Sequence, residues 1–222
     1  MIYRFEWNKQ QTYEAALKVV RDFIAINRLF PVPKFIVGVA PHTSNEWQTY
    51  GLYLPAGAVN EQPRIFVNVD KSTKPVKVRG RIWSFPGHKT DRTAAGILAH
   101  ETGHHASRIL AERLYRKTMV ATNASELMQL SIGYYKPWQA LLEKTKPITS
   151  YEPVPDEAFA ETARLFILNP NLLRRGNPAR YEFLTKELGL KPVVTYSWRK
   201  VLGSAPDFIY AAAEKYAGEL GE

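Results

Sequence analysis

Apolar side chains follow a helical spacing near the start of the chain and then alternate with polar ones along several short segments. Residues 8–28 carry apolar positions, among them Tyr13 and Leu17, that share one side of a helix. We expect Pro31 and Pro33 to end this helix, because proline has no backbone N–H to donate. Four segments follow that are rich in β-branched and aromatic residues, and each indicates a strand: 34–40, 50–54, 64–70 and 76–83.

The pattern becomes helical after Pro86 and stays helical along the rest of the chain. A long helix is predicted from Thr90 to about Lys117, with Thr90 or Asp91 as its N-cap, because either side chain can accept a hydrogen bond from the first turn. A proline-rich loop is predicted at 146–155. The other predicted helices cover about 125–144 with a break before Pro137, then 156–168, two or three further pieces, and about 206–217.

The order of the predicted elements indicates the fold class. A helix, a small sheet and then a run of helices, without repeats or a clear boundary, predict an α+β protein. We expect a single domain over 1–222, with the N-terminal helix and a small, mostly antiparallel sheet in about 1–89. The predominantly helical part, about 90–222, would carry the functional site.

The long predicted helix contains the sequence His-Glu-Thr-Gly-His at 100–104. Four residues advance an α-helix by slightly more than one turn, so His100 and His104 project from one face and can bind the same cation. Glu101 lies beside this pair, where its carboxylate could reach a metal-bound water without being a ligand. The alternative is a buried helix whose two histidines are satisfied by ordinary hydrogen bonds. Gly103 is unusual inside a helix and suggests that another segment approaches closely there.

Two histidines leave a zinc ion short of a third protein ligand, and the chain has no cysteine to supply it. Glu157 and Glu161 lie one turn apart on a predicted helix that is otherwise apolar. Two carboxylates on such a face are costly to bury without partners. We therefore assign Glu157 as the third ligand, and Glu161 as an acceptor from the N–H of His100 or His104. The alternative is a pair of carboxylates that face solvent.

The combination of HETGH with a later S-Y-(loop)-E-A-F-A-E resembles the gluzincin metallopeptidases over residues 93–168. It is most similar to the compact type seen in the catalytic domain of anthrax lethal factor. The resemblance implies a Zn²⁺ site formed by His100, His104 and Glu157, and Glu101 as general base. It also implies that Tyr151 stabilises the oxyanion. Small zincin-like proteins of this kind are often phage-encoded, which gives a hint about origin.

Other polar residues near these motifs have two interpretations each. His105 follows the motif directly and could orient Glu101, although an extra histidine is more often a packing or surface residue. Lys77, Arg79 and Arg81 alternate with apolar residues on the last predicted strand and could favour acidic peptide substrates. Alternatively, these charges protect an exposed strand edge from aggregation.

Composition and charge narrow the function further. The 222 residues carry a net charge of +9. They include no cysteine, and this absence excludes disulfides, Cys-based zinc fingers and a cysteine nucleophile. No apolar run approaches the roughly 18 residues of a membrane span, and the first residues do not resemble a secretory signal. We therefore expect a soluble cytoplasmic or otherwise intracellular protein without a membrane partner; association with a virion is the alternative.

The leading hypothesis is a zinc-dependent peptidase that acts on protein or peptide substrates through a metal-activated water and Glu101. The alternative is a non-catalytic binding or structural protein on a zincin scaffold, such as a virion component. A third possibility is a zinc protease that acts beside DNA. The positive charge permits nucleic-acid contact, but no motif indicates it.

Overall fold

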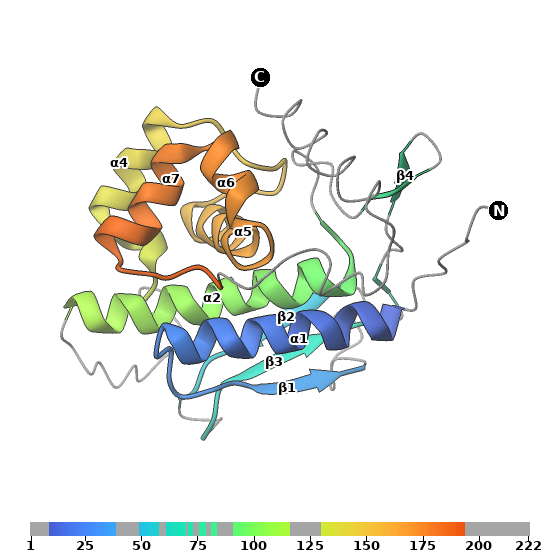
Figure 1. Ribbon diagram of the computed structural model, residues 1–222. Helices are drawn as coiled ribbons and strands as arrows, with labels where there is room; N and C mark the ends of the chain where they lie inside the picture. Colours follow the sequence, from blue (N-terminus) through green and yellow to red (C-terminus); the bar gives the residue numbers. More distant parts are fainter. Residues whose placement is uncertain are drawn as a thin grey trace.

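The computed structural model describes residues 9–38, 49–57, 61–69, 71–72, 76–78, 81–83, 91–115 and 130–193 (Figure 1). It shows the expected α+β order, in which an N-terminal helix and a small sheet precede a mainly helical part. The elements are α1 (Lys9–Ile26), β1 (Lys34–Val37), β2 (Gly51–Leu54), β3 (Arg64–Val67), β4 (Val76–Val78), β5 (Arg81–Trp83), α2 (Ala94–Tyr115), η2 (Ile132–Tyr134), α4 (Lys136–Lys144), α5 (Pro155–Leu168), α6 (Pro170–Gly176), α7 (Pro178–Glu182) and η3 (Phe183–Glu187).

The main sheet has three strands in the order β1-β3-β2. Strand β3 pairs in parallel with β1 and antiparallel with β2, so this sheet is mixed. The predicted strand 76–83 is instead two short strands, β4 and β5, which pair antiparallel in a separate sheet. The sequence held a signal for this division, because Gly80 lies between the two strands and glycine is typical of turns. Two of the three strand pairings are therefore antiparallel.

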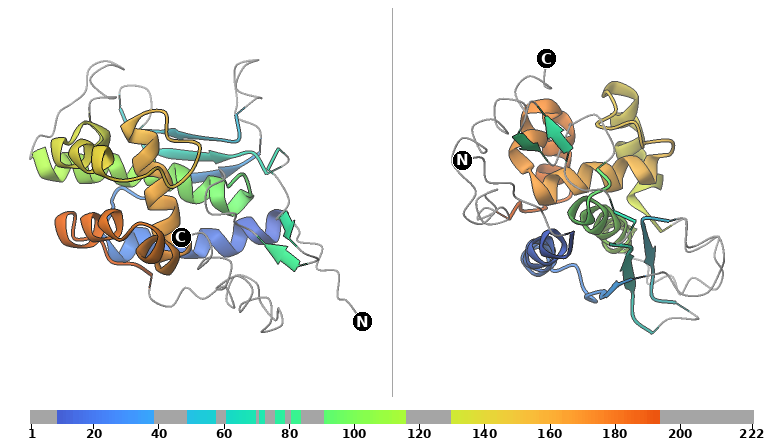
Figure 2. Two further views of the ribbon diagram at one scale, coloured as in Figure 1. Left: turned by 90° about the horizontal axis from the view of Figure 1, so that it is seen from above. Right: turned by 90° about the vertical axis from the view of Figure 1, so that its right-hand side faces the viewer.

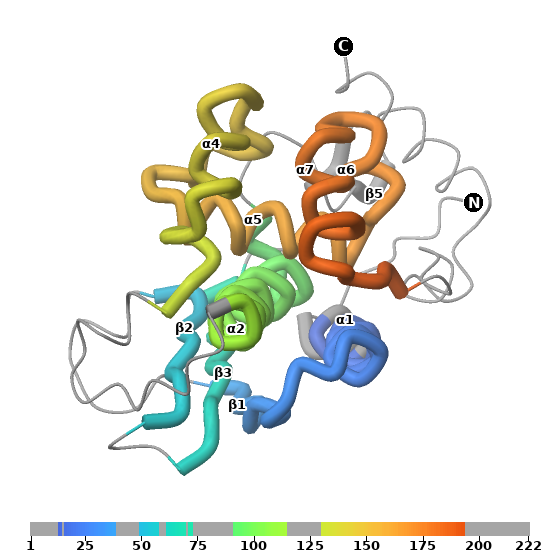
Figure 3. The backbone as a smooth tube through the Cα atoms, turned by 90° about the vertical axis from the view of Figure 1, so that its left-hand side faces the viewer, coloured from blue at the N-terminus to red at the C-terminus, as the bar shows by residue number. Residues whose placement is uncertain are grey.

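Helix α2 is the centre of the described structure. It packs against α1, β2 and β3 on one side and against α5 on the other, and the views in Figures 2 and 3 agree on this layered arrangement. The apolar stripe of α1 is buried as predicted, with Ala16, Val20 and Phe23 fully inside the core. The α1 helix ends before the prolines, because Arg28 takes a left-handed conformation with φ of 52°.

The start of α2 is fixed by two local hydrogen bonds. The Thr93 hydroxyl accepts from the Gly96 N–H at 3.1 Å, so Thr93 is the N-cap rather than Asp91. Asp91 instead accepts from the Thr93 N–H at 2.9 Å. Thr90, the other predicted cap, lies outside the described residues.

The close approach that Gly103 suggested is present between α2 and α5. A Cβ atom at Gly103 would lie 2.8 Å from the Cα of Ala160 and 2.9 Å from its carbonyl oxygen. Any side chain at this position would push the two helices apart. Because α2 carries the histidines and α5 carries Glu157 and Glu161, this contact sets the depth at which the two halves of the site meet.

Helices α6 and α7, which follow α5, are short and begin with proline as their first residue. The asparagines before these prolines, Asn169 and Asn177, act as N-caps. The predicted break before Pro137 is found between η2 and α4. The helix predicted at 206–217 lies outside the described residues. Residues 125–129, the start of the helix predicted at about 125–144, also lie outside them. No helix in the described part of the chain combines the length and hydropathy needed to span a membrane.

Candidate metal centre

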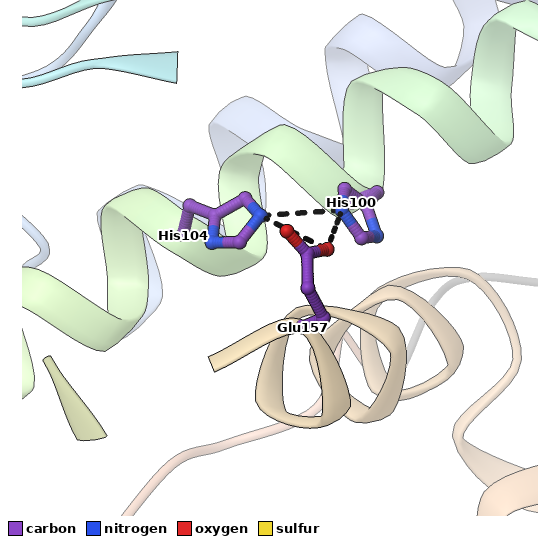
Figure 4. A group of neighbouring side chains, drawn as sticks. All are labelled: His100, His104 and Glu157. Carbon is purple, nitrogen blue, oxygen red and sulfur yellow. Dashed lines mark hydrogen bonds and ion pairs between the residues drawn. The ribbon is translucent and has the colours of Figure 1, made fainter. Parts of the chain in front are cut away.

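Three side chains from α2 and α5 converge on one point (Figure 4). His100 and His104 project from α2, and Glu157 reaches them from the first turn of α5. The two Nε2 atoms are 3.2 Å apart, and the Glu157 Oε2 atom lies 3.1 Å from Nε2 of His100 and 3.6 Å from Nε2 of His104. The fold therefore brings together the three residues that the sequence proposed as ligands.

The hydrogen bonds of the histidines define which nitrogen faces this point. Nδ1 of His100 lies 2.8 Å from Glu161 Oε1, and Nδ1 of His104 lies 3.1 Å from Asp156 Oδ2. An ionised carboxylate can only accept, so both Nδ1 atoms carry the proton. In the neutral rings, each Nε2 then presents a lone pair toward the other and toward the Glu157 carboxylate.

Three acceptors at this distance repel one another unless a cation or shared protons lie between them. While both rings are neutral, the buried Glu157 Oε2 has no donor among the described residues, which is costly for a carboxylate oxygen. Zinc–ligand bonds of about 2.0–2.1 Å at tetrahedral angles separate neighbouring ligand atoms by about 3.3–3.4 Å. The observed separations of 3.1–3.6 Å bracket this value. The group formed by His100, His104 and Glu157 could hold a metal ion.

The contacts among these groups also favour protonated imidazoles. Burial favours neutral rings, but the hydrogen bonds to Glu157 and Glu161 outweigh it and raise the pKa of His100. Burial likewise opposes charge on His104, and its bonds to Asp156 and Glu157 raise its pKa well above the ordinary value. The same contacts overcome the effect of burial on Glu157 and lower its pKa. A metal ion therefore binds in competition with protons.

A buried chain of charges extends from His100 to the start of α2. Glu161 accepts from Arg164 twice, Nε to Oε1 at 3.1 Å and Nη2 to Oε2 at 3.1 Å. The Arg164 Nη1 atom lies 3.7 Å from Asp91 Oδ2. Glu161, Arg164 and Asp91 are all buried. Glu161 is thus the acceptor that fixes the His100 ring, and Arg164 fixes Glu161 in turn.

Asp156 orients His104 as Glu161 orients His100, and the sequence analysis did not assign this role to Asp156. Its second oxygen, Oδ1, accepts from the Ser107 hydroxyl at 3.0 Å, and Ser107 accepts from the Ile132 N–H at 2.9 Å. The available signal was its place: Asp156 directly precedes Glu157 in the first helical turn. An acid there is favourable because of the helix dipole, so the position alone does not reveal a histidine partner.

Glu101 lies beside the metal-ligand group, between α2 and strand β2. It is 8% exposed, and burial raises the pKa of its carboxyl group against the opposing effect of His100 and His104. A Cβ atom at Gly51 would lie 2.7 Å from Glu101 Oε1. Glycine at this position of β2 therefore makes room for the carboxylate.

A pocket of about 370 Å³ opens onto these residues. Its wall includes His100, Glu101, His104 and Glu157 together with Gly51–Tyr53 of β2 and Tyr151. The Tyr151 ring centroid is 5.8 Å from that of His100, and 43% of this residue is exposed. The structure thus places Tyr151 at the mouth of the pocket, beside the ligand group.

The loop that carries Tyr151 is held by Glu152. The Oε1 atom of Glu152 accepts from the backbone N–H groups of Ile148 and Thr149 at 2.7 and 3.1 Å. Its Oε2 atom accepts from Arg180 Nη1 at 2.9 Å. Because Arg180 is buried, this bond ties the residue next to Tyr151 to the core.

His105 and the basic strand residues lie elsewhere. Nε2 of His105 donates to the Leu29 carbonyl oxygen at 3.1 Å, and its Nδ1 is 3.3 Å from the Tyr53 hydroxyl. Both nitrogens are thus engaged away from Glu101, and the direct orienting role suggested from sequence is not seen. Burial lowers the pKa of His105 to about 4, which keeps the ring neutral.

Strand β2 forms the strand wall of the described pocket. Lys77 lies on β4 and Arg81 on β5, in the separate two-stranded sheet, while Arg79 lies outside the described residues. Lys77 and Arg81 therefore do not lie on one face of a single strand, as the alternation predicted.

Comparisons with protein-family models, with curated proteins and with solved structures find no match to this chain. The interpretation of the site therefore depends on the geometry and chemistry of its own residues.

Proposed function

We propose that this protein is a zinc-dependent peptidase. The observation that carries the proposal is the convergence of His100 Nε2, His104 Nε2 and Glu157 Oε2, with Glu101 buried beside them on an open pocket. Two histidines and one carboxylate leave a position for water on a tetrahedral ion, which is typical of catalytic rather than structural zinc sites. A bound zinc ion supplies Lewis acidity and lowers the pKa of water to near 7.

The residues of the chain divide the remaining work. Glu101 accepts the proton of the attacking water and passes it to the leaving amine, for which a carboxyl with a raised pKa is suited. Tyr151, at the pocket mouth, donates a hydrogen bond to the substrate carbonyl oxygen as it gains negative charge. Glu161 and Asp156 keep the two imidazoles oriented so that each Nε2 lone pair faces the pocket.

The test combines metal analysis with one isosteric substitution. Purified protein is expected to bind about one zinc per chain and to cleave peptides from a proteome-derived mixture, with products read by mass spectrometry. Glu101→Gln should keep the zinc and lose about 100-fold or more in cleavage rate, because it removes the general base. Glu143→Gln, an exposed carboxylate on α4, removes the same charge and should have no effect.

Two outcomes would contradict the proposal. Equal cleavage by Glu101→Gln would remove Glu101 from the mechanism. A protein that binds zinc, unfolds on chelation and cleaves no peptide would instead have a structural metal site, as in the binding-protein alternative.

A further inference from the structure

One charged side chain of the pocket wall belongs neither to the metal-ligand group nor to its hydrogen-bond partners. Arg108 lines the pocket from α2, and its side chain is only 12% exposed. Its Nε atom is held by Glu112 Oε1 at 3.1 Å. The pair with Glu112 uses Nε, which leaves the two terminal nitrogens of the guanidinium to bind another group.

The position of Arg108 relative to the ligands follows from the helix. His100, His104 and Arg108 are spaced four residues apart, so they follow one face of α2 at intervals of about 6 Å. An extended peptide advances about 3.3 Å per residue. A metal ion would lie between His100 and His104, about 9 Å along the helix from Arg108. A substrate group that meets Arg108 therefore lies two or three residues from the bond at the metal.

The neighbouring pocket wall sharpens what Arg108 would bind. Leu52, Pro55 and Leu130 contribute apolar surface to the same pocket. In such surroundings a charge-assisted hydrogen bond is stronger than in water, and the planar guanidinium matches a carboxylate with two parallel bonds. Among the acids that line the pocket, Asp156 is already engaged by His104 and Ser107.

We infer that Arg108 binds a carboxylate of the substrate, two or three residues from the bond that is hydrolysed. The carboxylate comes either from an acidic side chain or from the free C-terminus of the peptide. This inference rests on the proposed peptidase function and names its substrate class. The net charge of +9 adds a long-range attraction for acidic peptides.

The experiment maps cleavage sites in a proteome-derived peptide mixture and then measures kcat/KM on matched synthetic peptides. One pair carries Glu or Gln at the enriched position, and a second pair ends in a free carboxylate or an amide at the same distance. We expect one of these pairs to show a preference of about 10- to 100-fold for the acid. Arg108→Gln should reduce this ratio to about one.

Three further measurements make the result specific. Arg108→Lys keeps the charge but not the paired bonds, and should give an intermediate ratio. Arg174→Gln removes an exposed charge on α6 and should leave the ratio unchanged. In Glu101→Gln protein, which should not turn over, calorimetry should show the same preference in binding and its loss on adding Arg108→Gln.

The failures are distinguishable. If wild-type protein cleaves peptides without an acidic preference, or if the preference survives in both Arg108→Gln and Arg108→Lys, the inference is wrong and the peptidase function stands. If zinc-loaded wild-type protein cleaves no peptide, the proposed function is wrong and the inference falls with it.

Discussion

The two histidines of the metal-ligand group are oriented by carboxylates in very different surroundings. On the deep side, Glu161 is 1% exposed and binds Arg164, which is completely buried. On the open side, the Asp156 side chain is 36% exposed, and its second partner is the neutral hydroxyl of Ser107. If a substitution removes the carboxylate on the open side, water can take its place as the partner of His104. On the deep side, water cannot reach His100 and Arg164 to replace Glu161. The same chemical role therefore carries very different energetic weight.

The largest effect is expected on the deep side. Glu161→Ala removes the acceptor of His100 and leaves the buried Arg164 cation without its closest counter-ion. We expect a loss of about 3–5 kcal/mol in the free energy of unfolding, together with a loss of about 10- to 100-fold in zinc affinity. Urea unfolding and a zinc competition titration measure the two quantities. A stable variant with normal zinc affinity would show that the deep side is no more demanding than the open one.

A smaller, pH-dependent effect is expected at the other end of Arg164. Burial raises the pKa of Asp91 to about 6, although Arg164 opposes this. Its unfolded pKa is about 3.9, so the folded state binds the proton more tightly. The contribution of Asp91 to stability is therefore greatest below pH 4 and is lost as pH rises through about 6.

Asp91→Asn tests this directly, because the amide stays neutral at every pH. Wild type loses the contribution of Asp91 as the pH rises, and the variant does not. The free energy of unfolding of Asp91→Asn minus that of wild type should therefore increase by on the order of 1–3 kcal/mol between pH 4 and pH 7. Asp22→Asn, at an exposed carboxylate of α1, is the control without a buried charge. A difference between Asp91→Asn and wild type that is constant from pH 4 to pH 8 would contradict the assignment.

The smallest effect is expected on the open side. Asp156→Asn keeps an oxygen that can accept from His104 but removes the charge. We expect zinc affinity to fall by about tenfold, at the low end for such outer partners, and the free energy of unfolding to change by less than about 1 kcal/mol. Zinc competition and urea unfolding again provide the readout. A loss as large as that of Glu161→Ala would mean that solvent access does not separate the two sides.

Local patterns predicted most of the helical structure. The stripe on α1, the long helix around His100 and the helix predicted at 156–168 all depend on residues close in sequence, and the structure confirms them. Strand details were harder, because strands of three or four residues give little periodicity. The segment 76–83 therefore was predicted as one strand, although it forms two.

Within the site, local patterns likewise predicted the residues that share one helix but not the contacts between helices. His100 and His104 share a face because one helix fixes their spacing, and the acid pair on α5 follows the same rule. Which acid meets which histidine depends on the crossing of α2 and α5 at Gly103 and Ala160. Asp156 and Arg108 had no distinguishing local pattern, since acids near helix starts and arginines on helices are common on protein surfaces.

The sequence by itself determined the α+β order, the pair of histidines on one helical face and the candidate acids, because these follow from backbone geometry over a few residues. Only the tertiary structure decided that Glu157 closes the metal-ligand group, that Glu161 and Asp156 take opposite sides, and that β2 forms the strand wall of the pocket. Those facts depend on contacts between segments about 50 or more residues apart. Such contacts are set by the packing of whole elements, which local patterns do not specify.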